Sequence, residues 1–171
     1  MEKVAKFEKV SFKQFREDLI AIAGNVFSEG EISEIYDNIK LPKRATVGSA
    51  GYDFFSPYNI IINSNATVKF PTGIRVKIDE GWVLKLYPRS GLGFKYRMQL
   101  DNTVGIIDSD YYNSYNEGHI MAKFTNDSKA NKAININIGE GYMQGIFVPF
   151  GITVDDDADG IRNGGFGSTT K

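Results

Sequence analysis

The sequence contains no cysteine and a single histidine, His119. The missing cysteine excludes disulfides, thiolate metal sites and a cysteine nucleophile. One histidine also argues against a histidine-rich metal site and a Ser-His-Asp triad. We interpret His119 as an ordinary strand residue, because it lies in an alternating stretch.

Neither sign of charge dominates, since 20 Lys and Arg residues face 21 Asp and Glu residues. No basic field therefore favours nucleic acid as a partner. No segment approaches the roughly 20 apolar residues of a membrane span, and the first ten residues lack the apolar stretch of a secretory signal. We predict one main domain in a cytoplasmic protein that binds neither nucleic acid nor membrane.

Two helix patterns lie near the N-terminus. The first begins with a capping box at Ser11 and Gln14 and stops at Gly24, and the second begins with a capping box at Ser28 and Glu31. Each has one apolar face, made by Phe12, Phe15, Leu19 and Ile22 in the first and by Ile32, Ile35, Tyr36 and Ile39 in the second.

After Pro42 the apolar residues alternate with a period of two, as in FKYRMQL (94–100) and AININI (133–138). Similar strand patterns occur in YNIII, TVKF, GIRVKI, WVLKLY, HIMAKFT and MQGIFVPF. They predict an all-β sandwich, barrel or jelly roll. We expect an N-terminal helical hairpin at 1–40, a β domain at 41–154 and a mobile C-terminal arm at 155–171, which is rich in Asp and Gly.

Five segments contain residue types that phosphate chemistry uses. Arg89-Ser90-Gly91 combines a bidentate cation, a hydroxyl and a residue that lets backbone N–H groups approach an anion. A structural turn would use Gly and Ser equally well. The five segments span residues 49–57, 87–95, 103–120, 139–147 and 162–170.

Taken in this order, the segments resemble the motifs of the trimeric deoxyuridine triphosphatases, the dUTPase family. The resemblance covers about residues 41–170. It is carried by Ala50-Gly51-Tyr52-Asp53, Pro88-Arg89-Ser90-Gly91, Gly105-Ile106-Ile107-Asp108-Ser109-Asp110-Tyr111 and Gly164-Gly165-Phe166-Gly167-Ser168-Thr169.

The resemblance implies a jelly-roll-like dUTPase fold and hydrolysis of dUTP to dUMP and pyrophosphate. Asp108 matches the general base that activates water for attack on the α-phosphorus. Tyr111 matches the residue that packs on the deoxyribose and excludes a 2′-hydroxyl. Asn102 matches a residue that helps to read uracil beside hairpin backbone groups, and Gly105 belongs to the same site.

The resemblance also implies phosphate contacts from Arg89, Ser90, Gly91 and Gln144. Mg²⁺ would be carried mainly by the triphosphate, with Asp53 holding it through a water molecule. The arm would close over the site in a homotrimer, with Phe166 over uracil and with phosphate contacts from the neighbouring arm residues Arg162, Gly167, Ser168 and Thr169.

The sequence departs from the family pattern in three places. YNSYNEGHI (112–120) inserts several residues where the pattern runs into Arg-Gly-Glu, Gly141 replaces a usual arginine, and Arg162 stands one residue nearer the glycines. Two alternatives stay open. One is a deoxycytidine triphosphate deaminase, which would share the fold, and the other is a non-catalytic module that keeps the nucleotide pocket to control a partner.

Overall fold

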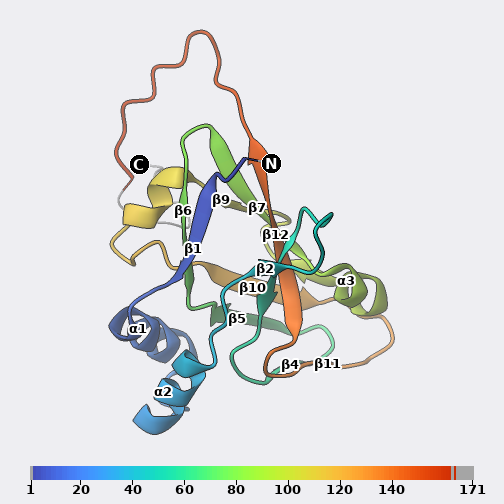
Figure 1. The fold of residues 1–171 in the computed structure, drawn as a ribbon. Coiled ribbons are helices and arrows are strands. Elements are labelled where there is room, and N and C mark those ends of the chain that lie inside the picture. Colours follow the sequence, from blue (N-terminus) through green and yellow to red (C-terminus); the bar gives the residue numbers. More distant parts are fainter. Residues whose placement is uncertain (1, 163, 165–171) are drawn as a thin grey trace.

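The computed structural model describes residues 2–162 and residue 164. These described residues form twelve strands and four short helices, whose arrangement is drawn in Figure 1. The strands are β1 (Ala5–Lys9), β2 (Lys43–Arg44), β3 (Tyr52–Phe55), β4 (Ile60–Ile62), β5 (Thr67–Pro71), β6 (Ile74–Ile78), β7 (Trp82–Pro88), β8 (Met98–Leu100), β9 (Gly105–Ile107), β10 (Met121–Asn126), β11 (Ile134–Ile136) and β12 (Gly141–Pro149). The helices are α1 (Phe12–Ala23), α2 (Glu29–Asp37), α3 (Ser90–Tyr96) and the 3₁₀ helix η1 (Ser109–Asn113).

All strand pairs are antiparallel, and the largest sheet has the order β2-β3-β12-β7-β9. A three-stranded sheet, β5-β10-β8, faces it across the core. Tyr142 of β12 joins the two layers, since its ring centroid lies 5.1 Å from that of Phe70 and 5.9 Å from that of Phe124. The predicted all-β architecture is confirmed.

The N-terminal helices pack on this β body, and Figure 1 shows them at its lower left. Phe15 and Leu19 of α1, and Ile32 and Ile35 of α2, are buried in the same apolar cluster as the strands. Phe12 is different, because 38% of it remains exposed. The helices therefore share the core of the β body.

The helix ends agree with the sequence at three points and differ at one. Gly24 ends α1 with φ 67°, and Ser28 and Glu31 form the complete predicted capping box. Ser11 caps α1, but the backbone N–H of Ser11 donates to Glu117 at 2.7 Å. Gln14 donates instead to Asp18. A carboxylate is a stronger hydrogen-bond acceptor than a side-chain amide. The carboxylate of Glu117, and not the side chain of Gln14, therefore accepts from the N–H of Ser11.

Two segments differ from the predicted secondary structure. Residues 5–9 form β1, which pairs with β6 from Ala5 opposite Ile78 to Lys9 opposite Ile74. The predicted strand at 94–100 is wrong in its first half, because Phe94 and Tyr96 belong to α3 and Phe94 is 92% exposed. The helix begins at Ser90 and ends before Arg97, which has a φ of 53°. The alternation of apolar and polar residues predicted a strand here, and the tertiary context overrides it.

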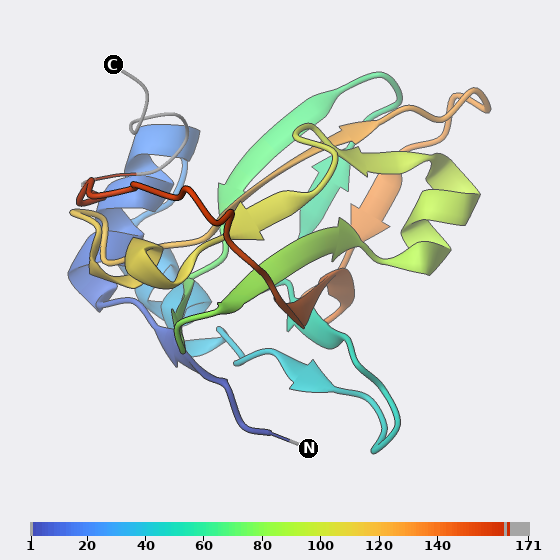
Figure 2. The same ribbon diagram turned by 90° about the horizontal axis from the view of Figure 1, so that it is seen from above.

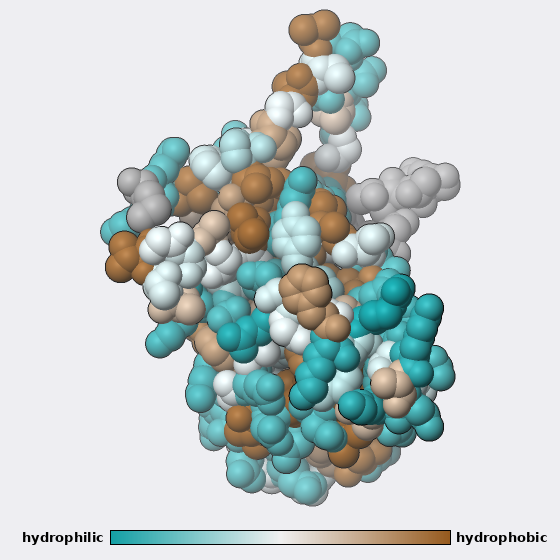
Figure 3. Space-filling model, turned by 90° about the vertical axis from the view of Figure 1, so that its right-hand side faces the viewer, coloured by the Kyte–Doolittle hydropathy of each residue, from teal (hydrophilic) through white to brown (hydrophobic). Residues whose placement is uncertain are grey.

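The segment after β12 leaves the body and returns to it near η1 (Figures 1 and 2). Figure 3 shows this segment standing out at the top, with apolar side chains on it. Four large apolar residues of this segment are at least half exposed: Phe150 at 51%, Ile152 at 74%, Val154 at 109% and Ile161 at 94%. Within the described chain, no helix is long and apolar enough to span a membrane.

The shared core gives a test of whether residues 1–40 fold independently. Phe15→Ala removes a fully buried ring, so we expect it to lower the free energy of unfolding by about 3–5 kcal/mol. Urea unfolding followed by circular dichroism should still show one transition. Phe94→Ala is the control, with a change within about 0.5 kcal/mol. A separate early transition in the Phe15 variant would contradict a common core.

Candidate active site

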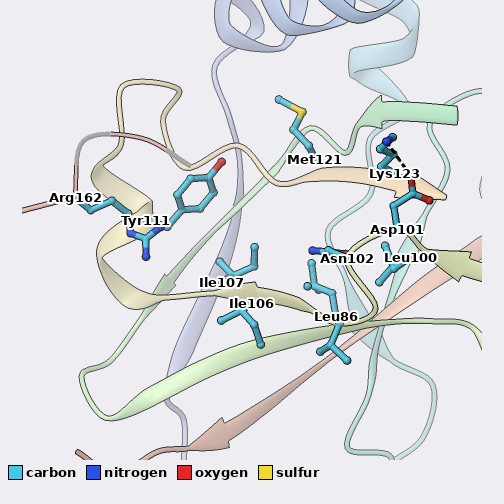
Figure 4. A pocket seen from close by; sticks show the side chains of 12 residues that line it. Leu86, Leu100, Asp101, Asn102, Ile106, Ile107, Tyr111, Met121, Lys123 and Arg162 are labelled. Carbon is cyan, nitrogen blue, oxygen red and sulfur yellow. Dashed lines mark ion pairs between the residues drawn. The ribbon is translucent and has the colours of Figure 1, made fainter. Parts of the chain in front are cut away.

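A pocket of about 300 Å³ opens between the two sheets and η1 (Figure 4). Its lining comes from β7, β8, β9, η1, β10 and the segment after β12. Four residues predicted from the sequence meet here, namely Asn102, Gly105, Tyr111 and Arg162. Apolar side chains make much of the wall, which suits a flat, weakly polar ring. The remaining lining residues are Leu86, Leu100, Asp101, Val104, Ile106, Ile107, Met121 and Lys123.

A tight turn between β8 and β9 forms the polar end of this pocket. The N–H of Thr103 donates to the carbonyl of Leu100 at 2.9 Å, and Thr103 has φ 66°. The turn is not the expected hairpin, because β8 pairs with β10 whereas β9 pairs with β7. Gly105 leaves the turn against β7, and a Cβ there would lie 2.9 Å from the Cβ of Leu86. Glycine is therefore required by close packing.

Asp108 lies between β9 and η1, and its carboxylate is bound by Arg162. An Arg162 Nη2 donates to Oδ2 of Asp108 at 2.5 Å, while Nε donates to Oδ1 of Asp110 at 2.8 Å. The guanidinium carbon lies 6.0 Å from the centroid of the Tyr111 ring, and Figure 4 shows the two side by side. Asp108 is 41% exposed along its side chain, so solvent reaches it.

Tyr111 is 5% exposed and is held at its hydroxyl. The hydroxyl donates to the carbonyl of His119 at 2.8 Å, and Nδ2 of Asn116 donates to the hydroxyl oxygen at 2.9 Å. Burial raises the pKa of Tyr111, so the phenol stays protonated and keeps its donor. Both partners come from the inserted segment at 112–120, which therefore buttresses the pocket.

The inserted segment is in turn attached to α1. Ser11 donates through Oγ and N–H to the two carboxylate oxygens of Glu117, at 2.6 and 2.7 Å. His119 is fully buried, and its Nδ1 lies 2.6 Å from Oδ2 of Asp18. Its Nε2 accepts from the N–H of Gly73 at 2.8 Å, so Nδ1 carries the proton that is donated to Asp18. The interpretation of His119 as an ordinary strand residue is wrong, because it precedes β10 and has specific polar partners.

A second cluster of predicted residues is formed by Asp53 on β3, Gln144 on β12 and Arg89 directly after β7. Gln144 is opposite Asp53 on one side and Tyr87 on the other. Nε of Arg89 lies 3.8 Å from Oδ1 of Asp53, and an Arg89 Nη donates to the carbonyl of Gly141 at 3.4 Å. A Cβ at Gly141 would lie 3.0 Å from that nitrogen. The absent side chain at position 141 thus leaves room for Arg89.

The two clusters lie on different sides of one chain. Arg89 directly precedes α3, whose first residues are Ser90 and Gly91, and Asp108 directly precedes η1. In Figures 1 and 2, α3 and η1 stand at opposite edges of the body. One chain therefore does not bring the predicted base and the predicted phosphate ligands together. The predicted contacts of Phe166, Gly167, Ser168 and Thr169 lie outside the described residues.

The described residues contain no cluster of three or more His, Asp or Glu side chains suited to a metal ion. Asp53 is mostly buried and has Arg89 beside it. A single carboxylate of this kind fits an ion that arrives on a polyphosphate and keeps most of its water molecules.

The sequence prediction missed Asp18, Asn116, Glu117 and His119 as supports of the pocket. The insertion after Tyr111 marked the place, but its partners on α1 are about a hundred residues away in the chain. Only the fold brings them together.

Comparison with known proteins identifies the family. The dUTPase family model matches residues 37–170, so the chain belongs to the dUTPase family. Among the similar proteins are the deoxyuridine 5′-triphosphate nucleotidohydrolases of Lactococcus lactis, 38% identical over 81% of this chain and 95% of that protein, and of Hahella chejuensis, 38% identical over 78% and 88%.

Solved structures agree with this assignment. The crystal structure of the dUTPase from Streptococcus mutans is 32% identical, covers 88% of this chain and 98% of its own, and superposes with a TM-score of 0.62. A dUTPase from phage phi11 of S. aureus, described with a structural Mg(II) ion, has the same fold at 20% identity and a TM-score of 0.61, covering 92% and 98%. The expected dUTPase fold is confirmed.

The Asp18–His119 pair predicts a dependence of stability on pH. Burial opposes ionisation of Asp18, but hydrogen bonds from His119 and Gln14 outweigh it and lower its pKa below the ordinary 3.8. A lowered pKa in the folded state stabilises the fold above the unfolded pKa, and this stabilisation is lost as pH falls through the folded value.

We therefore expect wild type to exceed Asp18→Asn in unfolding free energy by a constant amount above about pH 5 and by a shrinking amount below about pH 4. Urea titrations of both proteins between pH 2.5 and 7 measure the difference. A difference that grows towards acid pH would contradict the assigned direction.

Proposed function

We propose that this chain is a dUTP diphosphatase that hydrolyses dUTP to dUMP and pyrophosphate. The observation that carries the proposal is the position of Asp108, a solvent-accessible carboxylate at the exit of a strand that lines a ring-sized pocket. Membership of the dUTPase family and the named activity of its relatives in L. lactis and H. chejuensis support it.

In the proposed reaction, Asp108 accepts a proton from water as the water oxygen attacks the α-phosphorus and the bond to the bridging oxygen breaks. Water is a poor nucleophile at neutral pH, and a carboxylate within hydrogen-bond reach overcomes this. Of the two carboxylate oxygens of Asp108, only Oδ2 accepts a hydrogen bond from the described residues. The Oδ1 atom is available to the water.

The nucleoside would enter the pocket beside the turn at 100–105, where Asn102 and backbone groups can form hydrogen bonds to uracil. Tyr111 would lie against the deoxyribose. Arg89, Ser90, Gly91 and Gln144 would bind the phosphates, whose negative charge grows during displacement. Mg²⁺ would enter as part of the substrate, neutralising phosphate charge, with Asp53 as its carboxylate contact through water.

We further propose a homotrimer in which each site takes Asp108 from one chain and Arg89 from another. The separation of the two clusters supports this, because neither alone offers both base and phosphate ligands. The exposed apolar side chains at 150–161 also support assembly, since a segment of this kind is suited to bury them on a neighbour. The remainder of the arm would then complete a neighbouring site.

The first test replaces the base. Asp108→Asn keeps the shape but removes the proton acceptor, and we expect kcat for dUTP to fall about a hundredfold or more. Asp110→Asn is the matched control, because it removes the same charge and the same type of contact to Arg162. Pyrophosphate release from dUTP, dCTP, dTTP and UTP is measured, with ammonia release from dCTP alongside.

A fall of equal size in both variants would reject Asp108 as the base. Ammonia release from dCTP would point to the deaminase alternative, and dUTP binding without turnover in the wild type would point to the non-catalytic module.

The second test asks whether chains share a site. Asp108→Asn and Arg89→Ala are each expected to be inactive, and an equal mixture after subunit exchange should regain about a quarter of the wild-type activity, since that share of two-chain sites is intact. Sedimentation gives the oligomeric state. A mixture that stays inactive after demonstrated exchange would place both residues in the same chain's site.

A further inference from the structure

We propose that Asn116, His119 and Asp18 are positioning residues for Tyr111, and that helix α1 thereby helps to discriminate against a 2′-hydroxyl. The inference rests on the proposed function. According to this inference, the inserted segment at 112–120 and helix α1 help to determine substrate selectivity. Neither is part of the four dUTPase motifs quoted above.

The first step is the anchoring of the ring. A phenol has one proton to donate and can also accept, and Tyr111 uses both capacities, towards the carbonyl of His119 and the amide of Asn116. Rotation of the ring away from its position would break both bonds within a buried site. The face that Tyr111 presents to the pocket is therefore fixed by the inserted segment.

The second step is the rigidity of the inserted segment itself. Oδ1 of Asn116 accepts from the N–H of Gly118 at 3.2 Å, which holds the amide in the orientation that donates to Tyr111. Gly118 has φ 69°, and a Cβ there would lie 2.7 Å from the carbonyl oxygen of Tyr111. The segment thus folds directly onto η1, with no side chain between them.

The third step links the segment to α1. His119 supplies the carbonyl that binds Tyr111, and its imidazole is fixed by Gly73 on one side and Asp18 on the other. Because the imidazole is fully buried, losing Asp18 leaves a polar N–H without its acceptor. The bonds from Ser11 to Glu117 add a second attachment.

The consequence concerns selectivity more than rate. A ring that can shift leaves room beside the sugar, which benefits a substrate with an additional hydroxyl. The measured quantity is the ratio of kcat/KM for UTP to kcat/KM for dUTP. This ratio does not depend on the fraction of folded enzyme, so a purely structural role would not change it.

The experiment compares wild type with Asn116→Ala, Asp18→Ala and Tyr111→Phe. We expect each to raise the ratio about threefold or more, the size associated with one lost hydrogen bond. Tyr111→Phe combined with Asn116→Ala should raise it no further than the larger single change. The matched control is Arg16→Gln, which removes the α1–α2 ion pair to Glu29 without touching the inserted segment. Its ratio should stay at the wild-type value.

The outcomes separate this inference from the proposed function. No pyrophosphate release from dUTP by the wild type would reject the function itself. Normal wild-type turnover with unchanged ratios in Asn116→Ala and Tyr111→Phe would reject the positioning role. A raised ratio in these two but not in Asp18→Ala would exclude α1, and an equal rise in Arg16→Gln would show a nonspecific effect. If Asp18→Ala does not fold, Ser11→Ala tests the attachment through Glu117 by the same ratio.

Discussion

The hydrogen bond between the buried imidazole of His119 and the carboxylate of Asp18 joins helix α1 to the inserted segment, 101 residues further along the chain. On one side are the helices that share the core, and on the other is the segment that carries the hydroxyl partners of Tyr111. A buried donor must find an acceptor, and Asp18 of α1 is that acceptor. Together with the shared core and the bonds from Ser11 to Glu117, this contact ties the position of α1 to the shape of the pocket wall.

The elements that the sequence predicts well are those whose signals are local. Ser28 and Glu31 form their capping box because both partners lie within one turn, and the alternation around Ile134 and Ile136 gives a strand with those two side chains buried. The prediction fails where a distant partner decides. Gln14 loses its place to Glu117, and β1 forms because β6 offers it an edge, although residues 5–9 show no strong strand pattern.

The candidate site shows the same division. The motifs locate Asn102, Gly105 and Tyr111, and the fold gathers these in one pocket. The order of the motifs does not reveal that Arg89 and Asp108 lie on different sides of the folded chain. Arg89 follows β7 and Asp108 follows β9, and sequence spacing does not show that these two strands pair antiparallel. The supports of Tyr111 were also hidden, since only the folded structure brings Oδ2 of Asp18 within 2.6 Å of Nδ1 of His119.

The docking of α1 also has a consequence for the order of events during synthesis. Asp18 leaves the ribosome 101 residues before His119, and β1 likewise precedes its partner β6 by a long stretch of chain. At ribosomal rates of about 5–20 residues per second, the apolar faces of α1 and α2 wait on the order of 5–20 s for the segment that completes their surroundings. The N-terminal helices are thus made first but completed late, and during that interval their exposed leucine, isoleucine and phenylalanine side chains are a natural target for a chaperone.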